Sequence, residues 1–157
     1  SDVRIVLLGD GPEMERLQSM VKEKHLESNV EFRGWINRNE LPQQISDASI
    51  AIGPLKRTTV TENALPIKVL EYMASSLPIL AISGTLPDDV LIHGKNGYFV
   101  NDSKELEVKI CELLENSEKI DSMGNESLKM VQKFSWEKVV SDIIQSYEDI
   151  KNYSLKF

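Results

Sequence analysis

Short apolar runs alternate with helix-periodic segments along the first hundred residues of the chain. In the periodic segments apolar residues recur every three or four positions, which indicates a helix with one buried face. The apolar runs are short enough for buried strands and are bounded by glycine, proline or polar residues. They predict strands at Ile5–Leu8, Val30–Trp35, Ser49–Gly53, Pro78–Ile82 and Gly97–Val100.

Helices are expected between these strands and throughout residues 101–157. Between the first strands, the pattern predicts a helix with Met14, Leu17 and Val21 on one face and a helix over Leu41–Ala48. Pro66 is expected to open a third helix, whose buried face is Ile67, Leu70 and Met73 or Ala74. A short helix is predicted over Pro87–Ile92. After the last strand, it predicts helices around Leu106–Leu114, over Ser117–Lys133, and beyond the N-cap Ser135.

This order of elements predicts an α/β domain of Rossmann-like type. Strands that alternate with helices and are apolar on both faces form a parallel sheet with helices on both faces. We expect a single domain over residues 1–157, with the sheet in residues 1–100 and only helices in residues 101–157. Because ligands of such sheets bind at the carboxyl ends of the strands, the site should lie in the loops at 9–12, 34–38, 54–66 and 83–87.

Composition narrows the class of partner. The sequence is 41% hydrophobic and has a net charge of −7 without a basic stripe, which fits a folded domain and argues against nucleic acid as the main partner. A single cysteine, Cys111, and the lack of a long apolar run favour a cytoplasmic protein. Neither histidine has a partner at metal-ligand spacing, so no metal site is expected.

The turn at Gly9 and Gly11 follows a predicted strand and precedes a helix, as a phosphate-binding loop does. The third glycine of the dinucleotide-binding fingerprint is absent, because Met14 occupies its position; this disfavours a nicotinamide dehydrogenase. Glu13 and Glu15 would also repel a phosphate at this helix start. The pattern favours a tight structural turn, with a peripheral ligand contact as the alternative.

The helix that begins near Pro66 has the opposite charge pattern. Its start has Lys68 and no acid, so free backbone N–H groups and a lysine can bind a diphosphate there. Lys68 and Glu71 are spaced i, i+3 and share a face. The Glu71 carboxylate accepts two hydrogen bonds, which suits the two hydroxyls of a ribose. On spacing alone, the alternative is a simple surface Lys–Glu pair.

Five motifs follow one another along nearly the whole chain. They are G-D-G-P at 9–12, F-R-G-W at 32–35, V-L-E-Y-M-A at 69–74 with L-P-I at 77–79, L-P-D-D-V at 86–90 with G-K-N-G at 94–97, and F-S-W at 134–136. In this order they resemble the group 1, or family 4, glycosyltransferases of the GT-B fold. The chain departs from the family pattern at Ser76, where the family usually has glycine.

The resemblance implies roles for individual positions. Glu71 would bind the ribose of the donor nucleotide, and the backbone around Ala64 and Leu65 would contact the diphosphate. Asn63 occupies the position of the family's first glutamate and would face the donor sugar, which makes Asn63 and Glu71 the catalytic candidates.

Two further positions correspond to the place where the family binds the nucleotide base. These are Trp35 and Ile36, which directly follow the second predicted strand. The alternative for Trp35 is an ordinary core tryptophan.

The resemblance also implies a function for a longer protein. It would transfer a sugar, with retention and without a cofactor, from a nucleotide diphosphate sugar (UDP-linked before GDP-linked) to a glycan or lipid-linked acceptor in polysaccharide biosynthesis. We expect this chain to be the C-terminal donor-binding half, inactive alone, of an enzyme that works at the inner face of the membrane. The alternatives are a UDP-sugar epimerase of the GT-B type and a non-catalytic sugar-nucleotide-binding domain, for which Asn63 is the best support.

The resemblance implies that the family's first βα unit, whose strand is expected to be central in the sheet, is not part of this sequence. Ile5–Leu8 and Ser49–Gly53 would then flank an empty position with unpaired backbone groups. We expect these two strands to pair directly. The alternatives are a strand lent by a second copy, and an alignment with the family that is wrong by one unit.

Overall fold

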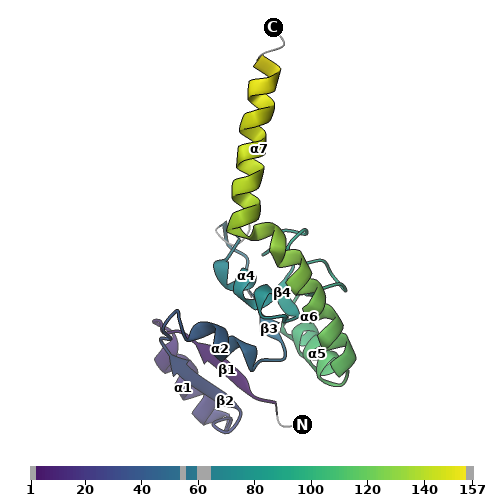
Figure 1. Ribbon diagram of the computed structural model, residues 1–157. Helices are drawn as coiled ribbons and strands as arrows, with labels where there is room; N and C mark the ends of the chain where they lie inside the picture. Colours follow the sequence, from purple (N-terminus) through teal and green to yellow (C-terminus); the bar gives the residue numbers. More distant parts are fainter. Residues whose placement is uncertain (1–2, 54–55, 60–64, 155–157) are drawn as a thin grey trace. The chain divides into compact units, whose positions relative to one another are not determined.

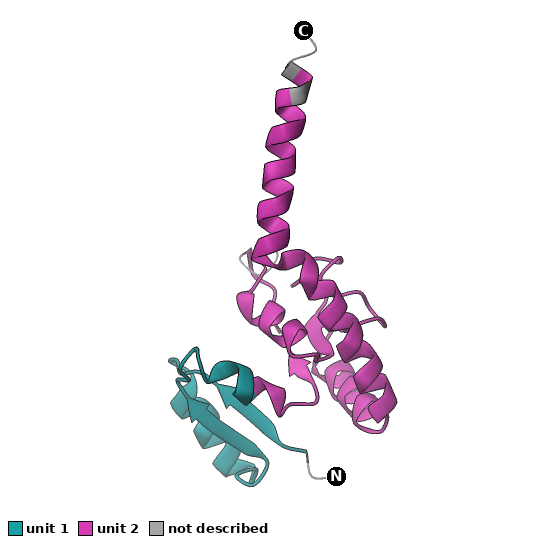
Figure 2. Cartoon of the chain, viewed as in Figure 1, with its two compact units in different colours: residues 1–44 teal, residues 45–157 magenta. Residues whose placement is uncertain are grey.

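The computed structural model describes residues 3–53, 56–59 and 65–154. The chain divides into two compact units, residues 1–44 and residues 45–157 (Figure 2). The boundary falls within helix α2, Leu41–Ser46. Each unit has its own parallel sheet, so the α/β class predicted from the alternation of strands and helices is confirmed.

Unit 1 is a β-α-β arrangement (Figure 1). Strand β1, Ile5–Leu8, is followed by helix α1, Met14–Glu23, and by strand β2, Val30–Gly34. The two strands are parallel, with Ile5 opposite Val30 and Leu8 opposite Gly34. These elements match the predicted ones, except that Trp35 lies beyond the end of β2.

Unit 2 contains a three-stranded parallel sheet in the order β3-β4-β5. Strand β3 covers Ala51–Ile52, β4 covers Ile79–Ile82 and β5 covers Gly97–Val100. Strand β4 is central and its first three residues are buried. Gly53 extends the pairing of β3, because its N–H donates to the carbonyl of Leu80 at 2.8 Å.

The expected direct pairing of Ile5–Leu8 with Ser49–Gly53 is wrong. In the described part of the chain, β1 pairs with β2 and β3 pairs with β4, in separate sheets. Strand β3 is also shorter than predicted, since only Ala51–Ile52 has strand geometry. A ladder of two residues offers few hydrogen bonds at about 1 kcal/mol each, too few to force a second pairing.

Among the described residues of unit 2, five further helices follow β3. They are α4 (Ile67–Ala74), α5 (Ser103–Leu114), α6 (Ser117–Val131), the 3-10 helix η1 (Gln132–Phe134) and α7 (Trp136–Ser154). Asp102 caps α5 by accepting from the N–H groups of Lys104 and Glu105, and Asn116 caps α6. The predicted cap of the last helix is confirmed, because Ser135 Oγ accepts from the N–H of Lys138 at 3.2 Å.

The core of unit 2 lies between its sheet and the helices α5 and α6. Leu80 of β4, Tyr98 of β5, Leu113 of α5 and Met123 of α6 pack together there. Gly97 is required at the start of β5, because a Cβ at this position would lie 1.9 Å from the carbonyl oxygen of Ile79. The close approach of β5 to β4 therefore requires glycine at position 97, because any side chain there would collide with β4.

The short helix predicted over Pro87–Ile92 is wrong; the segment forms a single hydrogen-bonded turn. The side chain of the fully buried Asn96 explains the difference. Its Oδ1 accepts from the N–H of Ile92 at 2.8 Å, and its Nδ2 donates to the carbonyl of Val90 at 3.0 Å. These bonds take backbone groups that a longer helix would pair within itself.

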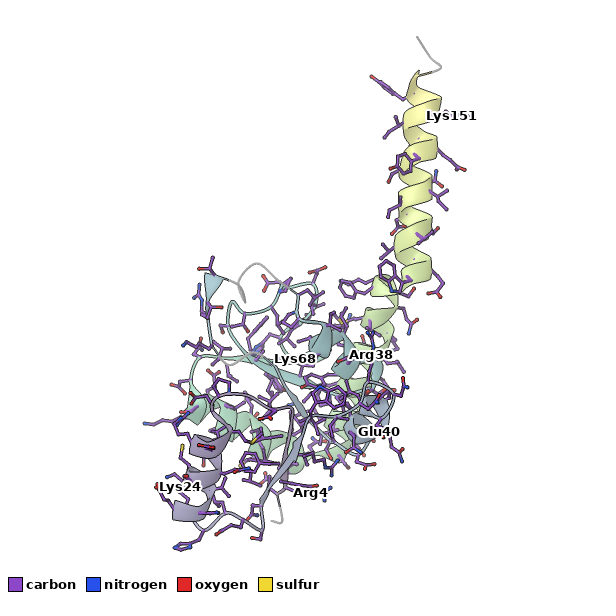
Figure 3. The ribbon with its side chains drawn as sticks, turned by 90° about the vertical axis from the view of Figure 1, so that its left-hand side faces the viewer. Arg4, Lys24, Arg38, Glu40, Lys68 and Lys151 are labelled. Carbon is purple, nitrogen blue, oxygen red and sulfur yellow. The ribbon has the colours of Figure 1, made fainter. Side chains whose placement is uncertain are left out.

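Helix α7 keeps an apolar face exposed. Large apolar side chains recur along it every three or four residues, and several are at least 48% exposed: Trp136, Val140, Ile143, Ile144, Tyr147, Ile150 and Tyr153. Figure 3 shows side chains projecting from α7, with Lys151 labelled near its end. Within the described residues, no helix is long and apolar enough to cross a membrane.

Candidate functional site

The turn after β1 is held by its own hydrogen bonds. The N–H of Gly9 donates to the carbonyl of Gly34 at 2.7 Å, which ties the end of β1 to the end of β2. Asp10 Oδ1 accepts from the N–H of Gly11 at 2.7 Å. Gly9 has φ +120°, a conformation that side chains disfavour. These bonds give the two glycines a structural role in a tight turn, which is the interpretation that the sequence favoured. The peripheral ligand contact stays a prediction.

Trp35 and Ile36 directly follow β2. Trp35 is 77% exposed, so the alternative of a core tryptophan is wrong. Ile36 is half buried. Both residues follow the strand end to which Gly9 is bonded, so four of the predicted site residues share the carboxyl edge of the unit 1 sheet. An exposed indole ring at a sheet edge is available to stack on a planar ligand.

Helix α4 brings the other described site residues together in unit 2. The helix begins at Ile67, one residue later than predicted, and Pro66 is its N-cap with extended φ/ψ of −67° and 128°. Lys68 lies exposed in the first turn, which has no acidic residue over Ile67–Leu70 (Figure 3). Glu71 is one turn further along and half buried. Leu65 precedes the cap and is half buried, whereas Asn63 and Ala64 lie outside the described residues.

The buried face of α4 differs from the predicted one. Val69 and Met73 are fully buried, whereas Ile67 is 69% exposed and Ala74 is exposed. The prediction is confirmed for Met73 and wrong for Ile67, because the i, i+4 pair Val69/Met73 anchors the helix. This orientation leaves Lys68 exposed to solvent and Glu71 partly so.

Tyr72 lies next to Glu71 and is affected by it. Burial raises the pKa of Tyr72 above its usual value of 10.0, and the Glu71 carboxylate adds to the rise. The phenol therefore stays neutral at physiological pH and can donate and accept hydrogen bonds beside Glu71.

Helix α6 fixes the end of α4. The α-carbon of Gly124 in α6 lies against the backbone of Ser76, in the turn that joins α4 to β4; a Cβ on Gly124 would lie 2.0 Å from the Ser76 carbonyl oxygen. Ser76 has φ +56°, the left-handed region. The family's usual glycine at this position thus has a physical reason, and this chain accommodates serine there at some cost.

Arg57 was not singled out from the sequence, although it lies in one of the loops expected to form the site. Its guanidinium packs against Gly84, in the loop after β4: a Cβ on Gly84 would lie 3.3 Å from Cζ and 3.3 Å from Nε of Arg57. The signal that could have identified this contact is the presence of a cation and a glycine in the loops after two adjacent strands. Within the described residues, no group of three or more His, Cys, Asp or Glu side chains could hold a metal ion.

Comparison with known proteins identifies the fold and the family. The sequence profile of the family described as "Glycosyl transferases group 1" matches residues 1–130. The chain is 29% identical over 95% of its length to an N-acetyl-alpha-D-glucosaminyl L-malate synthase of Bacillus anthracis, of which it spans 38%. It is 26% identical over 99% of its length to a GDP-Man:Man(3)GlcNAc(2)-PP-Dol alpha-1,2-mannosyltransferase of Dictyostelium discoideum, of which it spans 31%.

The fold matches that of a solved structure. The crystal structure of Anabaena HepE in complex with UDP and glucose superposes with a TM-score of 0.77, at 20% identity, over 94% of this chain and 41% of that one. The fold is therefore that of part of a GT-B glycosyltransferase, and the chain spans less than half the length of each of these three proteins.

Proposed function

The chain belongs to the group 1 glycosyltransferases, whose profile matches residues 1–130, and we propose that it binds the nucleotide diphosphate part of a sugar donor. The observation that supports this most directly is the start of α4. Lys68 stands in a first turn without acids, and Glu71 follows on the same face one turn later. An exposed cation, the backbone N–H groups of a helix start and a carboxylate match the phosphates and the ribose of one ligand.

Each site residue then has one task. Lys68 neutralises phosphate charge, the backbone at Ala64 and Leu65 donates to the diphosphate, and the Glu71 carboxylate accepts from the ribose hydroxyls. Asn63 contacts the donor sugar through its amide, which forms hydrogen bonds without adding charge.

In unit 1, Trp35 and Ile36 bind the base. The exposed Trp35 ring supplies the stacking surface. Gly9 and Gly11 contribute at most a peripheral contact, because their turn is already bonded internally and Glu13 lies next to it.

The donor is a nucleotide sugar, and a UDP-sugar is favoured over a GDP-sugar. The Anabaena protein is named as a complex with UDP and glucose, and the Dictyostelium relative is named for GDP-Man, so proteins of this fold and family use both bases. The longer protein transfers the sugar with retention, without a cofactor, to a glycan or lipid-linked acceptor. It works in the cytoplasm at the inner face of the membrane, and the acceptor is bound by a second domain.

The binding proposal is tested by calorimetry on this chain. UDP, GDP and their nucleosides are titrated into the wild type and into Lys68→Met, with Lys104→Met on the exposed start of α5 as a control that removes the same charge. We expect Lys68→Met to weaken UDP more than uridine, and the control to change neither. Equal losses for UDP and uridine would make Lys68 an ordinary surface residue.

The role of Glu71 is tested in an enzyme that contains both halves. Glu71→Ala should reduce transition-state binding by about 2–4 kcal/mol, as expected for a lost hydrogen-bond partner with charge. An unchanged kcat/KM in this variant would exclude Glu71 from the donor site.

A further inference from the structure

A second cation lies at the carboxyl edge of the unit 2 sheet. Arg57 follows strand β3 and packs on Gly84, which follows the adjacent strand β4. The position of a Cβ on Gly84 is 3.3 Å from Cζ, 3.3 Å from Nε and 3.6 Å from Nη2 of Arg57. The guanidinium therefore lies against a residue without a side chain.

The start of α4 belongs to the same edge. β3 and β4 are parallel, and the connection between them leaves β3 at its carboxyl end, passes Arg57 and then enters α4. A crossover helix starts at the carboxyl edge of its sheet, so Lys68 in the first turn of α4 and Arg57 in the preceding loop are on one side of unit 2. The two cations differ in chemistry, since arginine presents a planar fork and lysine a point charge.

We propose that Arg57 binds the diphosphate of the donor through this fork, and that Gly84 positions the guanidinium. The inference rests on the proposed function and extends it, because the sequence pattern assigned Lys68 alone to phosphate charge. An arginine can donate two parallel hydrogen bonds to phosphate oxygens. Arg57 therefore gives the site a preference for a phosphorylated nucleotide over a bare nucleoside.

Two features of Gly84 suit it to position the Arg57 guanidinium. It has φ +75°, a conformation that an alanine adopts only with strain. A methyl group at 3.3 Å from Cζ and Nε would also push the guanidinium by a few tenths of an ångström. Gly84→Ala should therefore disturb the position of Arg57 while keeping its charge.

The test is calorimetry of the 157-residue chain with UDP, UMP and uridine. We expect Arg57→Met to weaken UDP by about tenfold to a hundredfold, the range for a lost hydrogen bond to a charged group, and to leave uridine unchanged. Arg57→Lys and Gly84→Ala should give intermediate losses. Lys104→Met, which removes one charge from α5, should change UDP binding less than twofold.

The outcomes separate the inference from the proposed function. If the wild type binds UDP, Lys68→Met weakens it and Arg57→Met does not, the role of Arg57 is refuted while the proposed function stands. Equal losses for UDP and uridine in Arg57→Met would also refute it, because they indicate a general disturbance of the loop. A wild type that binds neither UDP nor GDP overturns both.

Discussion

Replacing Gly124 by alanine tests how the candidate site is supported. Gly124 lies within α6, and its α-carbon touches the backbone of Ser76 at the end of α4. A Cβ at this position would lie 2.0 Å from the carbonyl oxygen and 2.9 Å from the carbonyl carbon of Ser76, closer than Cβ atoms approach other atoms. Because the obstacle is backbone, α6 must move away from the turn between α4 and β4.

Two effects of opposite sign decide the magnitude. Alanine favours a helix over glycine by about 1 kcal/mol. Forcing a methyl group into a packed contact costs about 1–3 kcal/mol, and a rigid backbone neighbour favours the upper end of that range. Gly124→Ala should therefore lower the free energy of unfolding by about 1–2 kcal/mol, although the substitution improves helix propensity.

The assay is urea unfolding followed by far-ultraviolet circular dichroism, with hydrogen exchange of the amides in α4 and α6. The matched control is Asn125→Ala, the exposed neighbour in α6, which gains propensity of about 0.5 kcal/mol without a new contact. We expect a lower midpoint and faster exchange in Gly124→Ala and neither in the control. A Gly124→Ala protein as stable as the wild type would refute the close packing of α6 on the α4–β4 turn.

Two further substitutions test single contacts in unit 2. Ser76→Gly should raise the urea midpoint and stabilise the fold by about 0.5–1 kcal/mol, because φ +56° strains an L-residue more than glycine's extra freedom destabilises the folded state; a lower midpoint would contradict this. Lys133 Nζ lies 2.9 Å from Asp89 Oδ2, and its hydrogen bond lowers the pKa of Asp89 below the ordinary 3.8. The ionised Asp89 therefore stabilises the fold above its unfolded pKa and loses this effect as the pH falls through its lowered folded pKa. Lys133→Met should cost about 0.5 kcal/mol at neutral pH, as for an exposed pair, and less in acid, where only the bond from Lys133 Nζ to the Asp89 carbonyl at 2.6 Å is left to lose; a difference that does not shrink in acid would exclude the charge pairing.

The sequence alone determined most of the local elements and the family. Strands β1, β4 and β5 have the predicted bounds or differ by one residue, because runs of apolar residues between turn residues are a local signal. The common face of Lys68 and Glu71 also followed from spacing, since i and i+3 lie side by side on any helix. Five ordered motifs indicated the group 1 family, which the profile match confirms.

Tertiary structure decided which surfaces are buried and which backbones meet. The sequence placed both Ile67 and Met73 in the core, but α4 turns Val69 inward beside Met73 and leaves Ile67 exposed, because its orientation is fixed by the sheet and by α6. The sequence pattern also did not decide whether Trp35 is buried in the core or exposed, and in the structure it is exposed. Periodicity says that a helix has an apolar face, and neighbouring elements determine its width and direction.

Contacts between residues far apart in sequence were the least predictable. Asn96 bonds the backbone of Val90 and Ile92 and thereby limits a predicted helix to one turn. Arg57 meets Gly84 only because β3 and β4 are adjacent and parallel. The secondary-structure propensities of the two loops contain no information about the contact between Arg57 and Gly84. The residue types and their local spacing thus determined which groups are available, and the pairing of strands decided which of them come together, because a contact between distant segments depends on the packing of everything between them.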